Sequence, residues 1–186
     1  MFRGRRRESG LKNIALFVDG PNIIRKEFSI DLDELRKCVE FFGRIMIAKV
    51  FLNQFASQKL IEAIIAQGFE PEIIIAGEIE TDVDVAVAVN AVKAAYNDDV
   101  DIIAIASRDA DYLPAIQTAK EQGKETIVIG ANPGFSKALQ RAADFVKILT
   151  KREDRFEHRQ YRERGQKREK DQLEQAMDFI EEHSGE

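Results

Sequence analysis

The sequence of 186 residues predicts an α/β fold in which a mainly parallel sheet is covered by helices on both faces. Strand-like and helix-like segments alternate from residue 13 to residue 150, a pattern typical of strand–helix–strand crossovers. Several of the strand-like segments are continuous apolar runs, which are typical of strands buried on both faces. A chain of this length suits one domain with short extensions.

The first half of the domain supplies three expected strands. The run Asn13-Ile-Ala-Leu-Phe-Val18 predicts the first, and apolar residues at helical spacing then predict a helix over 31–42. Cys38 lies on that apolar spacing, and we interpret it as a core thiol. A strand over 45–52, a helix over 56–67 and a strand over 71–76 follow, with Gly43, Gly68 and Gly77 at the boundaries.

The segment 82–92 is ambiguous, because its many valines also suit a strand. Its length, its alanines and its lack of helix breakers favour a mostly buried helix over 83–97. Thr81 and Asp82 make a reasonable N-terminal cap for that helix.

The second half of the domain supplies the remaining strands. The run Asp101-Ile-Ile-Ala-Ile-Ala106 predicts a buried strand over 101–106. Glycines again mark the boundaries, at positions 123 and 130. The expected elements that follow are a helix over 112–122, a strand over 125–129, a helix over 135–142 and a strand over 145–149.

Charge is unevenly spread along the chain. The formal net charge is −5, of which residues 1–12 contribute +4, 13–150 contribute −7, 151–170 contribute +4 and 171–186 contribute −6. We expect a basic disordered N-terminus over 1–12, a folded domain over 13–150 and a charged helical tail over 151–186. The two basic stretches are either contacts for a nucleic acid or solvated surface, and the pattern leaves both readings open.

The composition also excludes several classes of protein. The single cysteine rules out a disulfide framework and a thiolate zinc site. Since no apolar stretch reaches the ~18 residues needed to span a bilayer, we expect no membrane association. The N-terminal arginines are followed by no apolar region of a secretory signal, so we expect a cytoplasmic protein.

Acidic side chains follow three of the expected strands. Asp19 ends the first strand, Asp84 lies in the helix after the third, and Asp109 and Asp111 follow the fourth. In an open parallel sheet, ligands bind at the carboxyl ends of the strands, so these carboxylates are expected to share one crevice. Mutual repulsion is relieved by a divalent ion, and Mg²⁺ or Mn²⁺ prefers oxygen ligands.

Each acidic residue also has a purely structural interpretation. Asp19 suits turn formation in Asp-Gly-Pro-Asn, and Asp82 suits a helix cap. Asp111 suits the N-cap of the helix that contains Pro114. Asp144 precedes the last strand, which places it at the opposite edge if that strand is parallel. Similarly, the loop from Gly130 to Ser136 suits either a phosphate cradle or an ordinary loop capped by Ser136.

Four motifs closely resemble the NYN domains, PIN-like nucleases of the LabA/DUF88 group. They are Val18-Asp19-Gly-Pro-Asn22, Thr81-Asp82-Val83-Asp84, Ser107-Arg108-Asp109-Ala-Asp111-Tyr112-Leu-Pro114 and Ala143-Asp144-Phe-Val. The resemblance implies a PIN-like Rossmannoid three-layer fold, a Mg²⁺ or Mn²⁺ centre and endoribonuclease activity. It implies that the catalytic and metal-binding residues are Asp19, Asp84, Asp109 and Asp111, and that Asn22 orients Asp19 or a substrate phosphate. Asp82 is a further candidate metal ligand, and Asn22, Ser107 and Arg108 are the candidate substrate contacts.

The chain departs from the family pattern at two positions. The family often has Lys-Gly-Val-Asp where this chain has Thr81-Asp82-Val83-Asp84, so a phosphate-binding lysine is missing. It often has glycine where this chain has Arg108, which either replaces that phosphate contact or lies exposed to solvent.

We therefore expect metal-dependent hydrolysis of RNA phosphodiester bonds. Two alternatives stay open: an RNA-binding module with a degenerate site, and an interaction module in which the tail helix pairs with itself or with a partner. We expect RNA as a partner, and a homodimer through the tail or the core is a further expectation. A phosphatase on the same layout lacks support, because the first motif is Asp-Gly-Pro-Asn rather than Asp-x-Asp.

Overall fold

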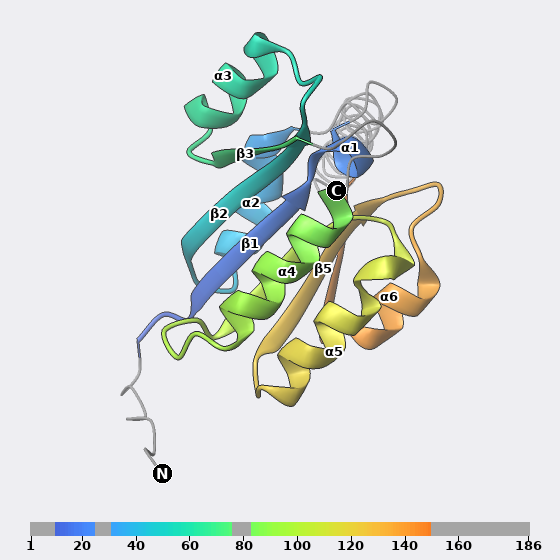
Figure 1. The fold of residues 1–186 in the computed structure, drawn as a ribbon. Helices are drawn as coiled ribbons and strands as arrows, with labels where there is room; N and C mark the ends of the chain where they lie inside the picture. Colours follow the sequence, from blue (N-terminus) through green and yellow to red (C-terminus); the bar gives the residue numbers. More distant parts are fainter. Residues whose placement is uncertain (1–9, 25–30, 76–82, 150–186) are drawn as a thin grey trace, which may run out of the picture. The chain divides into compact units, whose positions relative to one another are not determined.

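The computed structural model describes residues 10–24, 31–75 and 83–149. The expected disorder over 1–12 falls mostly outside these ranges, as do the proposed cap at Thr81 and Asp82 and the whole charged tail. Within the described ranges, thirteen helices and strands alternate along the chain (Figure 1).

The six strands are β1 (Asn13–Asp19), β2 (Arg44–Asn53), β3 (Glu70–Ile74), β4 (Ile102–Ala106), β5 (Glu125–Ala131) and β6 (Phe145–Leu149). The helical elements are α1 (Gly20–Ile23), α2 (Leu32–Glu40), α3 (Gln58–Ala66), α4 (Val83–Ala95), the 3₁₀ turn η1 (Ala110–Tyr112), α5 (Leu113–Glu121) and α6 (Lys137–Ala142).

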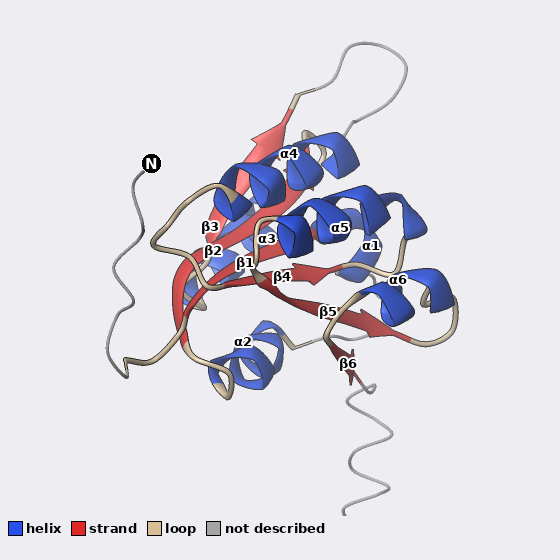
Figure 2. Cartoon of the chain, turned by 90° about the horizontal axis from the view of Figure 1, so that it is seen from below, coloured by secondary structure: helices blue, strands red, loops and turns tan. Residues whose placement is uncertain are grey.

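All six strands form one parallel sheet in the order β3-β2-β1-β4-β5-β6. Helices cover both faces of this sheet, as Figure 2 shows. The structure therefore confirms the expected α/β fold with helices on both faces. The short helix α1 is an addition that the sequence analysis did not contain.

The central strands are apolar on both faces because each face carries its own core. Every residue of β1 and β4 is buried. Ile14, Leu16 and Val18 of β1 join the core beneath α2 and α3, whereas Ala15 and Phe17 join the core beneath α4 and α5. Alternate residues of one strand thus hold two layers of helices.

The ambiguous valine-rich segment is the helix α4, as its length and alanines predicted. Its buried residues are Val83, Val87, Ala91, Ala94 and Ala95. They recur at helical spacing and pack into the core with Phe17, so tertiary packing stabilises a helix whose β-branched residues have only modest helix propensity.

The order of the strands reverses between β1 and β4. The chain leaves β1 toward β2 on one side, whereas β4 pairs with β1 on the other, with Val18 opposite Ala106. Ligands of open α/β sheets bind at the carboxyl ends of strands at such a switch point. Asp19 and Ser107 follow the last paired residues, so both lie at this edge of the sheet.

Two further observations concern Cys38 and the lengths of the helices. Cys38 packs against the core, its Sγ lies 3.1 Å from the Leu35 carbonyl, and burial raises the pKa of this thiol to about 11, as suits a structural thiol. Among the described residues no helix is long and apolar enough to cross a membrane, the longest being the 13 residues of α4.

Candidate metal centre

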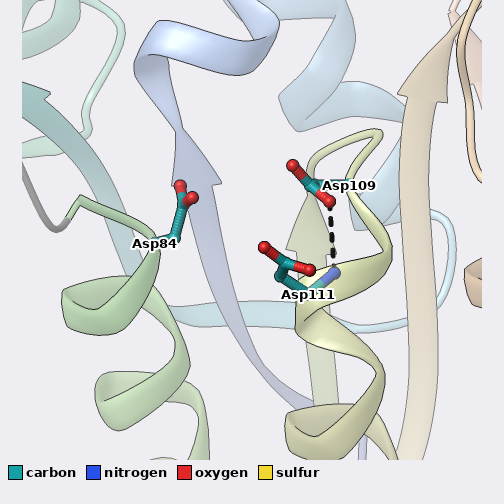
Figure 3. Close-up of side chains that lie close together, drawn as sticks. All are labelled: Asp84, Asp109 and Asp111. Atoms are coloured by element: carbon teal, nitrogen blue, oxygen red, sulfur yellow. Dashed lines mark hydrogen bonds between the residues drawn. The ribbon is translucent and has the colours of Figure 1, made fainter.

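Three carboxylates converge at the carboxyl edge of the sheet: those of Asp84, Asp109 and Asp111. One oxygen from each lies within 4.8 Å of an oxygen from each of the others. Asp84 comes from the first turn of α4, whereas Asp109 and Asp111 come from the turn after β4, and Figure 3 shows Asp84 across from the other two. Asp84 and Asp111 are exposed and Asp109 is half-buried, so solvent reaches the group.

Local hydrogen bonding explains how two of these carboxylates come from one short segment. Asp109 is the N-cap of η1, and its Oδ1 accepts a hydrogen bond from the backbone N–H of Asp111 at 3.2 Å. The resulting turn places the Asp111 carboxylate beside that of Asp109. The alternative in which Asp111 caps the following helix is wrong, because Tyr112 is the N-cap residue of α5 and its side chain makes no capping bond.

Asp19 lies beneath this group and is only 1% exposed. Its Oδ1 accepts from the backbone N–H of Asn22 at 3.1 Å, so it caps the short helix α1, where the sequence suggested an ordinary turn. Its Oδ2 accepts from the Ser107 hydroxyl at 3.1 Å and from the Tyr112 hydroxyl at 2.9 Å. Burial raises the pKa of Asp19 to about 6, although the Tyr112 hydrogen bond opposes that rise.

Tyr112 connects the buried carboxylate to the exposed group. Its side chain is fully buried, and its hydroxyl lies 2.9 Å from Asp19 Oδ2 and 3.1 Å from Asp84 Oδ1. Tyr112 was not among the site residues predicted from the sequence, where it stands only within the motif from Ser107 to Pro114. The available signal was its hydroxyl, since a buried tyrosine usually finds a hydrogen-bond partner.

Ser107 forms a second connection. Its hydroxyl donates to Asp19 and accepts from the backbone N–H of Asp109 at 3.2 Å. Because Ser107 is fully buried, this hydroxyl faces the carboxylates rather than solvent. Its contact with a substrate stays a prediction.

Arg108 is fixed along the same edge of the sheet. Its backbone N–H and its Nε both donate to the Asn22 carboxamide oxygen at 3.1 Å, and its Nη1 donates to the Pro133 carbonyl at 2.8 Å. Arg108 is half-buried rather than simply exposed to solvent. Asn22 therefore contacts two residues of the site: its backbone N–H donates to Asp19, and its side-chain oxygen accepts from Arg108.

The donor set fits a hard divalent ion. Ligand oxygens bind Mg²⁺ at 2.0–2.1 Å, so oxygens on opposite sides of one ion are about 4 Å apart. The group of Asp84, Asp109 and Asp111 is close to that spacing, and three carboxylates this near to one another repel in the absence of a cation. Asp19 is not a member of this group of three, so its direct ligation of a metal stays a prediction.

The remaining candidates lie elsewhere. Asp144 accepts from the backbone and side chain of Thr126, the second residue of β5, and from Lys120. It therefore lies at the opposite edge of the sheet, as a parallel last strand predicts. Ser136 caps α6 by accepting from Leu139, as the ordinary-loop reading predicted. Asp82 lies outside the described residues.

Comparison with known proteins identifies the family. A model of the NYN domain matches residues 13–149. The uncharacterized protein MJ0482 of Methanocaldococcus jannaschii is 57% identical over 141 residues, which make up 76% of this chain and 57% of that protein. The chain thus spans little more than half the length of that relative.

A solved structure supports the fold independently. The crystal structure of a protein of unknown function, VPA0982 from Vibrio parahaemolyticus, superposes with a TM-score of 0.69 at 20% identity, over 77% of this chain and 96% of that one. At this identity the likeness concerns the fold. The match of the domain model over most of the chain, together with the acidic motifs at the switch point, shows that the protein belongs to the NYN domain family.

Proposed function

We propose that the protein is a metal-dependent endoribonuclease that hydrolyses RNA phosphodiester bonds. The observation that carries this proposal is the convergence of Asp84, Asp109 and Asp111 within 4.8 Å at the switch point of an NYN domain. Three carboxylates from two separate segments are ill-suited to bind a polyanion by themselves, but they suit the binding of a cation that in turn binds a phosphate.

Mg²⁺ or Mn²⁺ would be held by Asp84, Asp109 and Asp111. Such an ion, when bound, activates water for attack and stabilises negative charge on the phosphate and on the leaving oxygen. The carboxylates themselves supply the negative charge and the oxygen atoms that select a hard cation. Asp19, held by Ser107 and Tyr112, adds a fourth negative charge beneath them whenever it is ionised.

Arg108 is the proposed contact for a substrate phosphate. Arg108 lies between Ser107 and Asp109 in the sequence. Hydrogen bonds to the Asn22 side chain and to the Pro133 carbonyl fix its guanidinium group. A pre-oriented guanidinium loses less conformational entropy on binding a phosphate than a freely rotating one. It would also partly replace the lysine that the family often has in the motif around Asp84.

Cleavage of a mixed RNA pool tests this function. The wild type, Asp109→Asn and Asp98→Asn are compared in Mn²⁺, in Mg²⁺ and in EDTA. Asparagine at position 109 still caps η1 through its side-chain oxygen, so this substitution removes the charge and keeps the turn. Asp98 is an exposed acid in the connection between α4 and β4, so its substitution is the matched control.

We expect the wild type and Asp98→Asn to cleave in Mn²⁺ or Mg²⁺ and to stop in EDTA. Asp109→Asn should lose activity on the order of a hundredfold or more. Cleavage that survives EDTA, or an Asp109→Asn variant as active as the wild type, would contradict the proposal. RNA binding without metal binding would instead favour the RNA-binding module.

A further inference from the structure

We propose that Tyr112 is a positioning residue of the metal centre, whose hydroxyl holds the Asp84 carboxylate toward Asp109 and Asp111 by anchoring it to the buried Asp19. This inference rests on the metal centre of the proposed function but not on the identity of the substrate. Its evidence is the hydroxyl itself, which lies 2.9 Å from Asp19 and 3.1 Å from Asp84.

The position of Asp84 in the helix leaves its side chain conformational freedom. Its side chain is exposed in the first turn of α4, where a carboxylate ordinarily samples several rotamers. Among the described residues, the Tyr112 hydroxyl is the hydrogen-bond partner of this side chain. Since Asp109 and Asp111 carry the same charge as Asp84, repulsion favours the rotamers of Asp84 that point away from them.

The Tyr112 side chain, in contrast, is held rigidly. Its ring is fully buried in the core with Phe17, Val83 and Ile116, so the position of its hydroxyl is set by packing. A tyrosine hydroxyl is protonated at neutral pH, and its single proton is shared between Asp19 Oδ2 and Asp84 Oδ1, which lie 2.9 and 3.1 Å from the phenolic oxygen. The hydroxyl is therefore a fixed donor at the boundary between the core and the exposed carboxylates.

Asp84 keeps oxygen lone pairs that can bind a metal ion. A carboxylate has two oxygens and about four lone-pair sites, so accepting one hydrogen bond leaves capacity for a cation. Hydrogen bonds from residues behind the ligands orient metal-binding carboxylates, and their loss typically costs about 10–100-fold in metal affinity or activity. Tyr112 is such a residue: it lies behind Asp84 and forms a hydrogen bond with its carboxylate.

The test removes only the hydroxyl. Tyr112→Phe keeps the ring in the core, and Tyr96→Phe is the matched control, because Tyr96 is 65% exposed just after the other end of α4. Mn²⁺ affinity is measured by calorimetry at pH 7.5 on the full chain. We expect Tyr112→Phe to bind Mn²⁺ about 10–100-fold more weakly, with Tyr96→Phe unchanged. Equal affinity of Tyr112→Phe and the wild type would overturn the inference.

A double-mutant cycle asks whether Tyr112 acts through Asp84. If it does, Tyr112→Phe should cause little further loss of Mn²⁺ affinity when Asp84→Asn is already present. The same fold-loss in both backgrounds would mean that Tyr112 acts by another route and would overturn the inference. RNA cleavage is assayed separately, so a protein that shows the expected Mn²⁺ results without cleaving RNA retains the inference and loses the proposed ribonuclease activity.

A measurement on the unaltered protein guards against misfolding of the variant. Ring ¹³C resonances of the tyrosines are followed during titration with Mg²⁺, which is diamagnetic. Tyr112 should shift with the same saturation as metal binding, while Tyr96 should not. A Tyr112 resonance that stays in place while Mg²⁺ binds would overturn the inference. If the wild type binds neither Mg²⁺ nor Mn²⁺, the metal centre and this inference fall together.

Discussion

Asn22 and Arg108 are joined across the carboxyl edge of the sheet, because one carboxamide oxygen of Asn22 accepts hydrogen bonds from both the backbone N–H and the Nε of Arg108. The residues are 86 positions apart in the chain and follow the two adjacent central strands. A neutral side chain thus orients a charged one, and substitution can separate what each would contribute to the proposed binding of RNA.

Arg108→Gln should weaken RNA binding and lower the slope of log affinity against log salt concentration by about one, because one phosphate contact and its released counterion are lost. Asn22→Ala should also weaken binding, but with little change in slope, since the charge remains and only its orientation is lost. Fluorescence anisotropy with a labelled RNA at several salt concentrations gives both quantities.

Arg36→Gln is the control for these substitutions. Arg36 makes a surface ion pair with Glu40 and donates to the Gly68 carbonyl, at a distance from the acidic group along α2. It should leave affinity and slope unchanged. If Arg36→Gln and Arg108→Gln lower the slope equally, the effect is one of general surface charge and Arg108 has no specific role.

Mn²⁺ should stabilise the wild type against heat, since a ligand that binds only the folded state adds RT ln(1 + [L]/Kd) to the free energy of unfolding. Asp84→Asn and Asp109→Asn should lose most of that gain. In EDTA, however, both variants should be at least as stable as the wild type, because each substitution removes one of several mutually repelling carboxylates. Thermal unfolding with and without millimolar Mn²⁺ measures both effects.

A wild type whose melting temperature does not respond to millimolar Mn²⁺ would count against the metal centre. Asp98→Asn again provides the control and should keep the full response to Mn²⁺. If Mn²⁺ raises the melting temperatures of the wild type and all three variants equally, it binds nonspecifically to the acidic surface.

The metal-free protein should lose stability as the pH rises through the range in which Asp19 titrates. Burial raises the pKa of Asp19 from 3.8 to about 6, so between these values the folded state binds more protons than the unfolded state. The contribution of a protonated Asp19 is fully present below pH 3.8 and is lost as the pH passes about 6. A pKa difference of this size corresponds to roughly 3 kcal/mol in the free energy of unfolding.

Asp19→Asn isolates this contribution. Asparagine is close in shape and cannot ionise, so the variant should match the wild type near pH 4 and exceed it in stability near pH 8. Urea unfolding in EDTA across that range yields the difference curve. A difference that grows as the pH falls would have the wrong sign and would show that the ionised carboxylate stabilises the fold.

The basic ends of the chain should raise RNA affinity without taking part in the chemistry. Residues 1–12 and 151–170 each carry a net charge of +4, whereas residues 13–150 carry −7. A protein limited to residues 13–150 should bind RNA more weakly and with a flatter salt dependence, while single-turnover cleavage at saturating RNA changes little. Equal salt slopes for the two proteins would mean that the domain binds RNA unaided.

Local patterns were sufficient to predict the sheet and most of its helices. The runs at β1 and β4 are apolar at every position because both faces of the central strands are covered, and that signal lies within five to seven residues. The helix α4 was the hard case, since its valines favour a strand. Its buried residues recur at helical spacing, which only its length and alanines indicated beforehand.

The close group of three carboxylates was predictable from the sequence, but its connections to the residues around it were not. Three of the four named aspartates form the close group, since the carboxyl ends of parallel strands meet at one edge. Nothing local indicated that Asp19 would be buried beneath them or that Tyr112 would join it to Asp84. These contacts join residues 93 and 28 positions apart, and the side-chain packing that creates them has no signature in a short motif.

The central position of the β1–β4 pair has a consequence for the synthesis of the protein. The hydrogen bond from Ser107 to Asp19 spans 88 positions, and β1 borders β2 and β4 but not the late strands. A ribosome-bound chain that has released β1, β2 and β3 therefore lacks the Ser107 and Tyr112 hydroxyls that contact Asp19, and Asp84 cannot meet Asp109 and Asp111 until those residues emerge. If the protein is the ribonuclease proposed above, an unfinished chain lacks the complete metal centre and cannot cleave RNA.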